Sequence, residues 1–343
     1  MHEAMFSRSL PGNAVACSLC PHHCAIADRK HGLCGVRENR GGTLWSLNYG
    51  KVIAAHVDPI EKKPLFHFQP GARAFSVAAA GCNLRCAFCQ NWEISQATKG
   101  QTRSIDGQHT DAAEVVAAAE RAGCNVIAFT YTEPTVFYEW ALDVARAAKE
   151  RNLSNVFVTN GFIEAEPLRH IRGYLDAANV DLKAFREATY REVMGASLKP
   201  VLETLRLMKD LGIWVEVTTL VVPQMNDSEE ELRDIASFVA RDLGPDTPWH
   251  VSAFHPDFRY TNAQPTRPNS LRRAADIGRE EGLRYVYVGN LPVPGGEDTS
   301  CHACGTTLIQ REGFHVRANR ITSDQSCPRC GARVSGVAMA ARV

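Results

Sequence analysis

Short apolar runs alternate with longer amphipathic segments through the middle of the chain. The apolar runs are rich in β-branched residues and almost continuously hydrophobic, which is typical of strands covered on both faces. The segments between them carry apolar residues at helical spacing. This pattern predicts strands at 74–80, 125–131, 155–159, 178–182, 213–222, 250–254 and 284–288, and helices at 111–122, 134–151, 164–174, 199–211, 228–242 and 270–281.

The ends of the predicted helices carry the expected local signals. Asp111 and Ser228 are predicted N-caps, and Pro134 suits a first helical position. A glycine that suits a helix end follows three of the helices, at Gly123, Gly212 and Gly282. Six or seven strand–helix units favour an α/β fold of the β/α-barrel type, complete or partial. A doubly wound open sheet is the rival, because spacing alone does not tell whether the sheet closes.

The flanking segments differ from this repeat and predict three parts. Residues 1–73 are rich in Gly, His, Cys and Pro, and predict a cysteine-rich module followed by a connecting segment. Residues 74–292 hold the predicted barrel. The run Leu-Pro-Val-Pro-Gly-Gly after Asn290 is typical of a linker. Residues 293–343 then predict a ribbon of alternating apolar and polar positions.

Composition and charge indicate an ordinary globular protein. The 343 residues are 45% hydrophobic, and 38 Lys and Arg balance 38 Asp and Glu. No basic block is present, so neither nucleic acid nor a membrane is an expected partner. The first ten residues lack the apolar core of a signal peptide, and no later run is long enough to span a membrane. We therefore predict a cytoplasmic location.

Cysteine usage points to metal binding. Twelve cysteines in 343 residues are far too few for a disulfide-stapled scaffold. Cys124 stands alone and is predicted to be a small buried hydrophobic residue. The other eleven fall into three short-spaced groups: Cys17, Cys20, Cys24 and Cys34; Cys82, Cys86 and Cys89; and Cys301, Cys304, Cys327 and Cys330.

The three cysteines of the middle group directly follow the first predicted strand of the barrel. The carboxyl end of a barrel strand is where active sites lie. Three nearby thiolates do not close a four-ligand site, whereas a cubane iron–sulfur cluster held by three leaves one iron open, as a catalytic site requires. The alternatives are a zinc site completed by a histidine and three reduced structural thiols.

The Cys-x3-Cys-x2-Cys loop resembles that of the radical S-adenosylmethionine (SAM) superfamily, including the aromatic Phe88 before the third cysteine. The resemblance implies that Cys82, Cys86 and Cys89 bind a [4Fe-4S] cluster whose fourth iron is chelated by SAM. It also implies reductive cleavage of SAM to methionine and a 5′-deoxyadenosyl radical, which abstracts hydrogen from a substrate. A flavodoxin or ferredoxin is then the expected electron donor.

The resemblance extends to residues at the ends of the next three strands, which are expected to bind the cofactor. Thr132 and Glu133 lie where relatives carry Gly-Gly-Glu-Pro, although Tyr131 and Thr132 replace the glycines. Thr-Asn-Gly and Asp-Leu-Lys strings also occur in the pyruvate formate-lyase activating branch, where they line the cofactor. They supply Asn160, Asp181 and Lys183 here. Taken singly, such strings also suit a generic turn and a surface ion pair.

Further strings resemble the radical enzyme of the AmmeMemoRadiSam system along nearly the whole chain. They begin at Asp58, Leu220, His250 and Tyr285, and the paired Cys-x-x-Cys-Gly motifs complete the set. This resemblance implies an unidentified substrate linked to Memo-type and AMMECR1-type proteins. Activation of a glycyl-radical enzyme is the first alternative function. A non-catalytic, metal-stabilised binding protein is the second.

The two outer cysteine groups are each sufficient for a closed four-thiolate site. The N-terminal group fits either zinc or a second iron–sulfur cluster, because both take four thiolates. The C-terminal pairs have spacing close to that of a zinc ribbon, and rubredoxin-like iron would use the same ligands. We expect this ribbon to be a separable module that docks near the barrel mouth.

A few polar residues are candidates for the substrate side of the site. His255 follows the sixth predicted strand, and this position favours a catalytic role. Lys62 and Lys63 lie in a polar run before the first strand, where a solvated connecting loop is the more ordinary interpretation.

Overall fold

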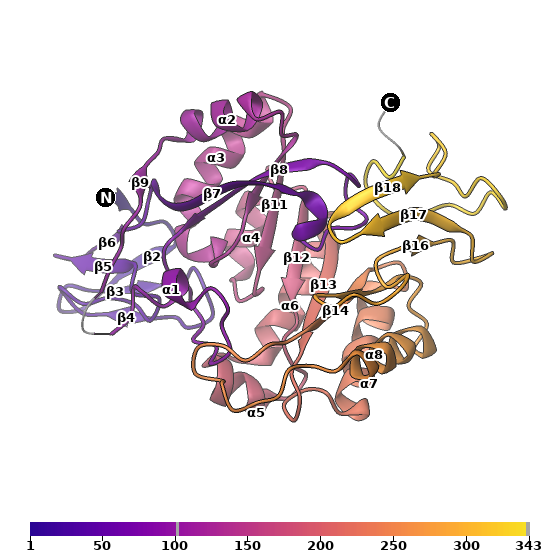
Figure 1. The fold of residues 1–343 in the computed structure, drawn as a ribbon. Coiled ribbons are helices and arrows are strands. Elements are labelled where there is room, and N and C mark those ends of the chain that lie inside the picture. The colour runs from indigo at the N-terminus through magenta and orange to yellow at the C-terminus, as the bar shows by residue number, and fades with distance from the viewer. Residues whose placement is uncertain (101–102, 341–343) are drawn as a thin grey trace.

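The computed structural model describes residues 1–100 and 103–340. Within these residues, one nine-stranded sheet forms the centre of the molecule (Figure 1). All seven predicted strands are present in it and pair in parallel in chain order. They are β8 (Arg73–Ala79), β10 (Val126–Phe129), β11 (Ser154–Thr159), β12 (Ala177–Asp181), β13 (Trp214–Val221), β14 (Trp249–Ala253) and β15 (Val286–Gly289).

The sheet is a partial barrel that stays open. Its described strand order runs from β15 at one edge to β9 (Gln108–His109) at the other, so the two edges do not pair. The parallel strands follow one another without the reversal of order that defines a doubly wound sheet. The partial β/α barrel expected from the sequence is therefore confirmed, and the doubly wound alternative is wrong.

The helices lie where the pattern predicts them and begin and end at the predicted signals. Ser228 Oγ accepts a hydrogen bond from Glu231 N at 3.2 Å, and Asp111 N donates to Glu114 Oε2 at 2.8 Å. The predicted helices correspond to α2 (Ala112–Arg121), η2 (Pro134–Phe137), α3 (Tyr138–Glu150), α4 (Ala165–Ile171), α6 (Leu198–Asp210), α7 (Glu229–Phe238), η4 (Val239–Leu243) and α8 (Pro268–Glu280). None of the described helices is long and apolar enough to cross a membrane.

Four short turns of helix were not predicted, because each is too short to show a periodic pattern. They are η1 (Ile60–Lys62), α1 (Trp92–Ser95), α5 (Glu187–Thr189) and the π-helical turn η3 (Tyr190–Met194).

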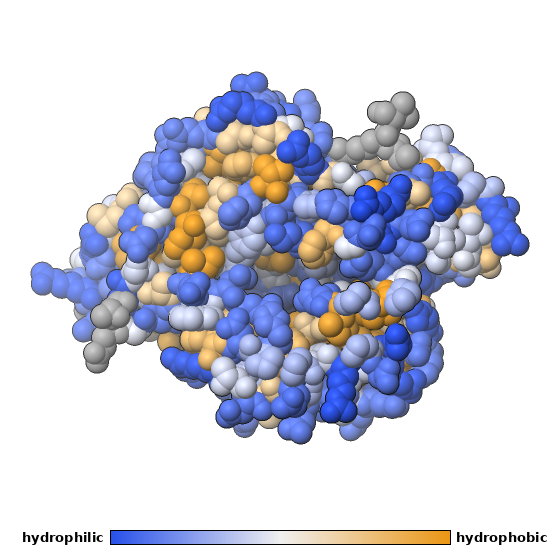
Figure 2. Space-filling view, viewed as in Figure 1, coloured by the Kyte–Doolittle hydropathy of each residue, from blue (hydrophilic) through white to orange (hydrophobic). Residues whose placement is uncertain are grey.

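An antiparallel strand, β7 (Lys51–Pro59), extends the sheet beside β8. It lies in the segment that the sequence predicts to be a connection. A groove between β7 and α2 is lined by apolar residues such as Ile53 and Val115. Figure 2 shows apolar residues gathered over this part of the surface.

The N-terminal module consists of two small antiparallel sheets. One contains β1 (His2–Glu3), β6 (Thr43–Ser46) and β5 (Arg37–Arg40), and the other contains β2 (Ser7–Leu10), β3 (Ala14–Cys17) and β4 (Ala25–Ile26). Both Arg37 Nη atoms donate to the Glu139 carboxylate of α3 at 2.8 Å, and both side chains are buried. This bidentate ion pair joins the module to the barrel.

The C-terminal ribbon contains β16 (Thr299–Ser300), β17 (Thr307–Glu312) and β18 (His315–Asn319). His67 Nδ1 bonds Ser335 O at 2.6 Å, and Arg311 Nη2 donates to Phe66 O at 2.9 Å. The backbone N–H groups of Phe66 and His67 donate in turn to Glu216, near the start of β13. The ribbon therefore docks at the amino ends of the strands.

The expected docking of the ribbon near the barrel mouth is thus wrong. The physical reason is an apolar face at the opposite end, where Phe66, Tyr285 and Tyr287 pack with ribbon residues such as Leu308 and Ile309. This separate cluster is shared by the ribbon and the barrel strand β15, so the ribbon packs directly on the barrel. Figure 1 shows the ribbon and the N-terminal module on opposite sides of the sheet.

Candidate active site

The loop that carries Cys82, Cys86 and Cys89 starts at the carboxyl end of β8 and is fixed by the surrounding backbone. Its N–H groups at Arg85 and Ala87 donate to carbonyls of η3, at 2.9 and 3.2 Å. Asn83 Nδ2 donates to Phe162 O at 2.7 Å, beyond the end of β11. Segments that follow β11 and β12 therefore hold the loop at the carboxyl end of the barrel.

Hydrogen-bond donors point at the sulfur atoms of this loop. Leu84 N lies 3.3 Å and Asn160 Nδ2 lies 3.6 Å from Cys82 Sγ, while Ser95 Oγ lies 3.2 Å from Cys89 Sγ. Hydrogen bonds to sulfur are one of the means by which proteins set the potential of an iron–sulfur cluster. The donor set therefore fits a cluster with three protein ligands.

Burial and charge around the loop favour metal binding over free thiolates. Burial raises the pKa of Cys86 to about 11, and it also raises the pKa of Cys82. Such thiols stay protonated until a metal ion displaces the proton. Lys183 Nζ pairs with Asp181 Oδ2 at 2.7 Å. Burial lowers the pKa of Lys183, but Asp181 and Cys86 outweigh it and raise this pKa, so the lysine is a stable cation close to Cys86.

Glu133 is buried and connects the ends of β10 and β11. Its Oε1 accepts from Thr135 N, Thr135 Oγ1 and Thr159 Oγ1 at 3.0, 2.6 and 2.8 Å. Its Oε2 accepts from Asn160 N at 2.8 Å. The carboxylate therefore fixes the backbone of Asn160, whose side chain reaches Cys82.

Tyr131 takes the backbone conformation for which a glycine is best suited, with φ of 63°. Two contacts hold its side chain: its hydroxyl donates to Asp58 Oδ2, and Lys63 Nζ lies 4.5 Å from the centre of its ring. Thr132 Oγ1 donates to Ala79 O at 2.7 Å. The site thus keeps a left-handed turn at a residue other than glycine.

The remaining predicted residues lie within the loop or against it. Phe88 is buried against Tyr260, with ring centres 6.3 Å apart. His255 is exposed and lies 2.8 Å from Gln90 Nε2 through its Nδ1. Phe88 is thus part of the cluster loop. His255 reaches the loop by its contact with Gln90, the residue that follows the third cysteine.

The C-terminal cysteines form a compact four-thiol group. Cys301 Sγ lies 3.6 Å from Cys330 Sγ, and Cys304 Sγ lies 3.7 Å from Cys327 Sγ. Zn–S bonds of about 2.3 Å in a tetrahedron require sulfur–sulfur distances of about 3.8 Å. All four sulfur atoms lie within 4.8 Å of one another, so the group is the right size for one metal ion.

A buried polar network contacts Tyr131 and was not predicted, although its members Lys62 and Lys63 were named as candidates. Asp58 Oδ2 lies 2.7 Å from Lys63 Nζ, and Asp58 Oδ1 lies 2.9 Å from Lys62 Nζ. Lys63 and Asp58 are both buried. The polar run that contains them resembles a solvated loop, and only the pairing of β7 with β8 places it against Tyr131.

This fold and this cysteine loop define a class of partial β/α-barrel enzymes that bind a metal cluster at the carboxyl ends of their strands. A model of the radical SAM superfamily matches residues 77–239. An uncharacterised protein of Methanocaldococcus jannaschii is 45% identical over 335 residues, which cover 97% of this chain and 99% of that protein. The chain belongs to the radical SAM superfamily, which implies a [4Fe-4S] cluster and SAM.

A more distant relative matches in sequence, and a solved structure matches in fold. Pyruvate formate-lyase 1-activating enzyme of Escherichia coli (strain K12) is 21% identical over 231 residues, which cover 64% of this chain and 93% of that enzyme. A radical SAM methyltransferase from Sphaerobacter thermophilus matches the fold with a TM-score of 0.51 and 19% identity, covering 65% of this chain and 67% of that chain.

Proposed function

We propose that the chain cleaves SAM reductively at a [4Fe-4S] cluster bound by Cys82, Cys86 and Cys89, and that the resulting 5′-deoxyadenosyl radical takes hydrogen from a substrate. The observation that carries this proposal is the group of three thiols on one loop, with Leu84 and Asn160 donating to Cys82. When bound, the cluster would supply the low-potential electron that this cleavage requires.

The chain's own residues would bind and orient SAM beside this loop. Asp181 and Lys183 present opposite charges near Cys86, which suits the zwitterionic methionine end of SAM. Glu133 acts as a positioning residue, because its carboxylate holds Asn160. We further propose that Phe88 and Thr132 line the same pocket, and that His255, next to Gln90, faces the substrate.

For the substrate, we propose an unidentified molecule or protein linked to Memo-type and AMMECR1-type proteins. The similarity to the pyruvate formate-lyase activating enzyme covers 64% of this chain, so a third of the chain has no counterpart in it. Additional cysteine modules at both ends support a substrate other than that of the activating enzyme. Activation of a glycyl-radical enzyme is the second candidate, supported by the names of these relatives.

A basic hollow beside the cluster loop supports a flavodoxin or ferredoxin as the electron donor. None of the described residues that line it carries a carboxylate. Acidic surfaces are steered towards such a region by its electrostatic field. Its cationic side chains are Arg85, Lys99, Arg103 and Arg259, and His22 and His31 also line it.

The test is production of 5′-deoxyadenosine by the reconstituted protein under anaerobic conditions with dithionite and SAM. We expect the wild-type chain and a Cys124→Ala control to form it, because Cys124 belongs to none of the three groups. Cys86→Ala should not form it. Equal traces from wild type and Cys86→Ala would refute the proposed cleavage.

A further inference from the structure

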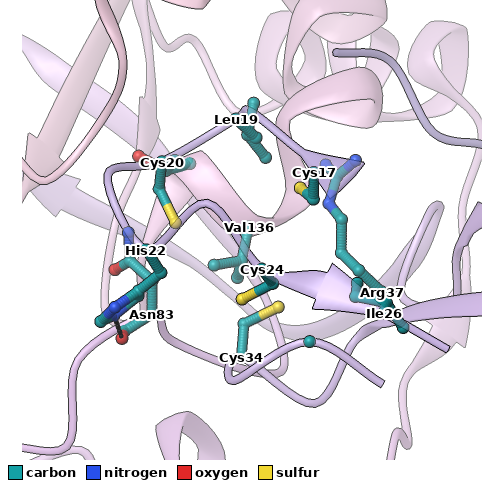
Figure 3. Close-up of a pocket in the computed structure, with 12 residues that line it drawn as sticks. Cys17, Leu19, Cys20, His22, Cys24, Ile26, Cys34, Arg37, Asn83 and Val136 are labelled. Atoms are coloured by element: carbon teal, nitrogen blue, oxygen red, sulfur yellow. Dashed lines mark hydrogen bonds between the residues drawn. The ribbon is translucent and has the colours of Figure 1, made fainter. Parts of the chain in front are cut away.

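The four N-terminal thiols surround a hollow. Cys17 ends β3, and Cys20, Cys24 and Cys34 follow on the loops around it. In Figure 3, Cys24 and Cys34 point their sulfur atoms towards each other, while Cys17 and Cys20 lie across the hollow from them.

This arrangement is wider than that of the C-terminal group. Among the described residues, only the C-terminal group has all its ligand atoms within 4.8 Å of one another, and the N-terminal thiols do not meet that limit. A four-iron cluster places each thiolate on a different iron atom, so its four thiolates stand farther apart than those of a single zinc ion. The two outer cysteine groups therefore differ in the size of the group that they fit.

The wall of the hollow supplies an unused hydrogen-bond donor. Arg37 is 1% exposed, and both its Nη atoms are taken by Glu139. Its Nε–H has no partner, although the side chain lines the hollow and lies beside Cys17 (Figure 3). A buried donor without an acceptor costs about 1–3 kcal/mol. A cluster sulfur atom in the hollow would accept this bond.

The rest of the wall is mainly apolar, formed by residues such as Leu19, Ile26 and Val136. A dry wall with a few directed N–H groups suits an iron–sulfur cluster, whose potential depends on burial and on hydrogen bonds to sulfur. Close packing also fixes the chain directly after Cys34. Gly35 lies so near Thr98 that a Cβ there would be 1.9 Å from the Thr98 carbonyl oxygen.

We propose that Cys17, Cys20, Cys24 and Cys34 bind a second four-iron, four-sulfur cluster, separate from that of Cys82, Cys86 and Cys89. All four irons have a thiolate, so this cluster has no open position for SAM. The two sites are neighbours. Asn83 lines the hollow and directly follows Cys82, and His22 Nε2 lies 2.8 Å from Asn83 O.

The test uses the full chain with Cys82, Cys86 and Cys89 all replaced by Ala, so that only the N-terminal site can hold inorganic sulfide. After anaerobic reconstitution, we expect about four sulfides and at least four irons per chain, with the Mössbauer spectrum of a cubane. Further replacement of Cys20 and Cys34 by Ser should remove the sulfide, whereas adding Cys124→Ala instead should not.

Zinc in this site, or no inorganic sulfide in the folded triple variant, would overturn the proposal. Rubredoxin-like iron in the C-terminal group does not confuse the result, because it brings no sulfide. If the triple variant fails to fold, the wild-type chain decides. If both clusters are present, the wild-type chain should contain about eight inorganic sulfides per molecule. About four would mean that the N-terminal site holds no cluster.

Discussion

Asp58 shows how one residue holds a buried cation beside the active site. Its carboxylate contacts Lys63 at 2.7 Å and Lys62 at 2.9 Å, and Tyr131 donates a third hydrogen bond. Lys63 is 1% exposed, so Asp58 is the group that compensates its charge. The same carboxylate also fixes the left-handed turn at Tyr131.

We predict that Asp58→Asn lowers the free energy of unfolding by about 3–5 kcal/mol, because it leaves Lys63 buried without a counter-ion. Urea unfolding at neutral pH measures this. Asp210→Asn is a matched control, since Asp210 is exposed at the end of α6, and it should change the value by no more than about 0.5 kcal/mol.

The Asp58 effect should also depend on pH. Burial alone would raise the pKa of Asp58, but hydrogen bonds from Lys63, Tyr131 and Lys62 hold it well below its usual value. The stabilisation is therefore present above the unfolded pKa of about 3.9 and is lost as the pH falls through the folded pKa. The difference in the free energy of unfolding between wild type and Asp58→Asn should therefore become smaller below about pH 4. A difference in unfolding free energy that stays constant with pH would contradict this account.

At the scale of elements, the C-terminal ribbon is predicted to need its metal while the active site does not. Cys301→Ser with Cys304→Ser should remove one metal equivalent and lower the melting temperature, because metal binding contributes to folding. Formation of 5′-deoxyadenosine should persist, because the ribbon packs at the amino ends of the strands. Metal analysis and the cleavage assay measure both effects. Loss of SAM cleavage in a variant that is folded and still contains the active-site cluster would show that the active site does depend on the ribbon's metal.

Elements with a local signal were predictable from the sequence, and elements with a distant partner were not. Buried parallel strands are continuously apolar, and the glycines of the two C-terminal knuckles have φ values of 72° and 74° as their turns require. In contrast, β7 carries a mixed pattern and becomes a strand through pairing with β8. Likewise, the ribbon's position depends on His67 and Ser335, which are 268 residues apart.

The same principle applies to the site. The three cysteines after β8 were visible as a motif, because all of them lie on one loop. The role of Asn83 was not, because its contact with Phe162 joins segments 79 residues apart. The role of Ser95 was not visible either, because it lies on the short helix α1, which shows no periodic pattern. Glu133 was visible as part of a motif, but two of its four hydrogen bonds, from Thr159 and Asn160, depend on β11.

At the scale of the whole molecule, His67 is predicted to make the joint between barrel and ribbon sensitive to acid. Ser335 O can only accept, so Nδ1 carries the proton and Nε2 accepts from the Tyr287 hydroxyl at 2.5 Å. Burial lowers the pKa of His67 to about 4. In the unfolded chain His67 therefore binds a proton near pH 6.5. In the folded chain it does so only near pH 4.

This difference should lower the free energy of unfolding as the pH falls from about 6.5 to 4, by up to about 3 kcal/mol. Thermal unfolding of wild type and His67→Gln across this range measures it. The glutamine variant should be less stable at pH 7 but lose less stability on acidification. Parallel pH profiles for the two proteins would show that His67 does not titrate as described.

The Arg37–Glu139 ion pair has a consequence for synthesis on the ribosome. The two residues are 102 positions apart, so the cysteines of the N-terminal module leave the exit tunnel well before α3 does. At about 5–20 residues per second, the interval is roughly 5–20 s. During that time the nascent chain presents four thiols without the helix that later secures their module. We expect the growing polypeptide to be most vulnerable to oxygen in this interval.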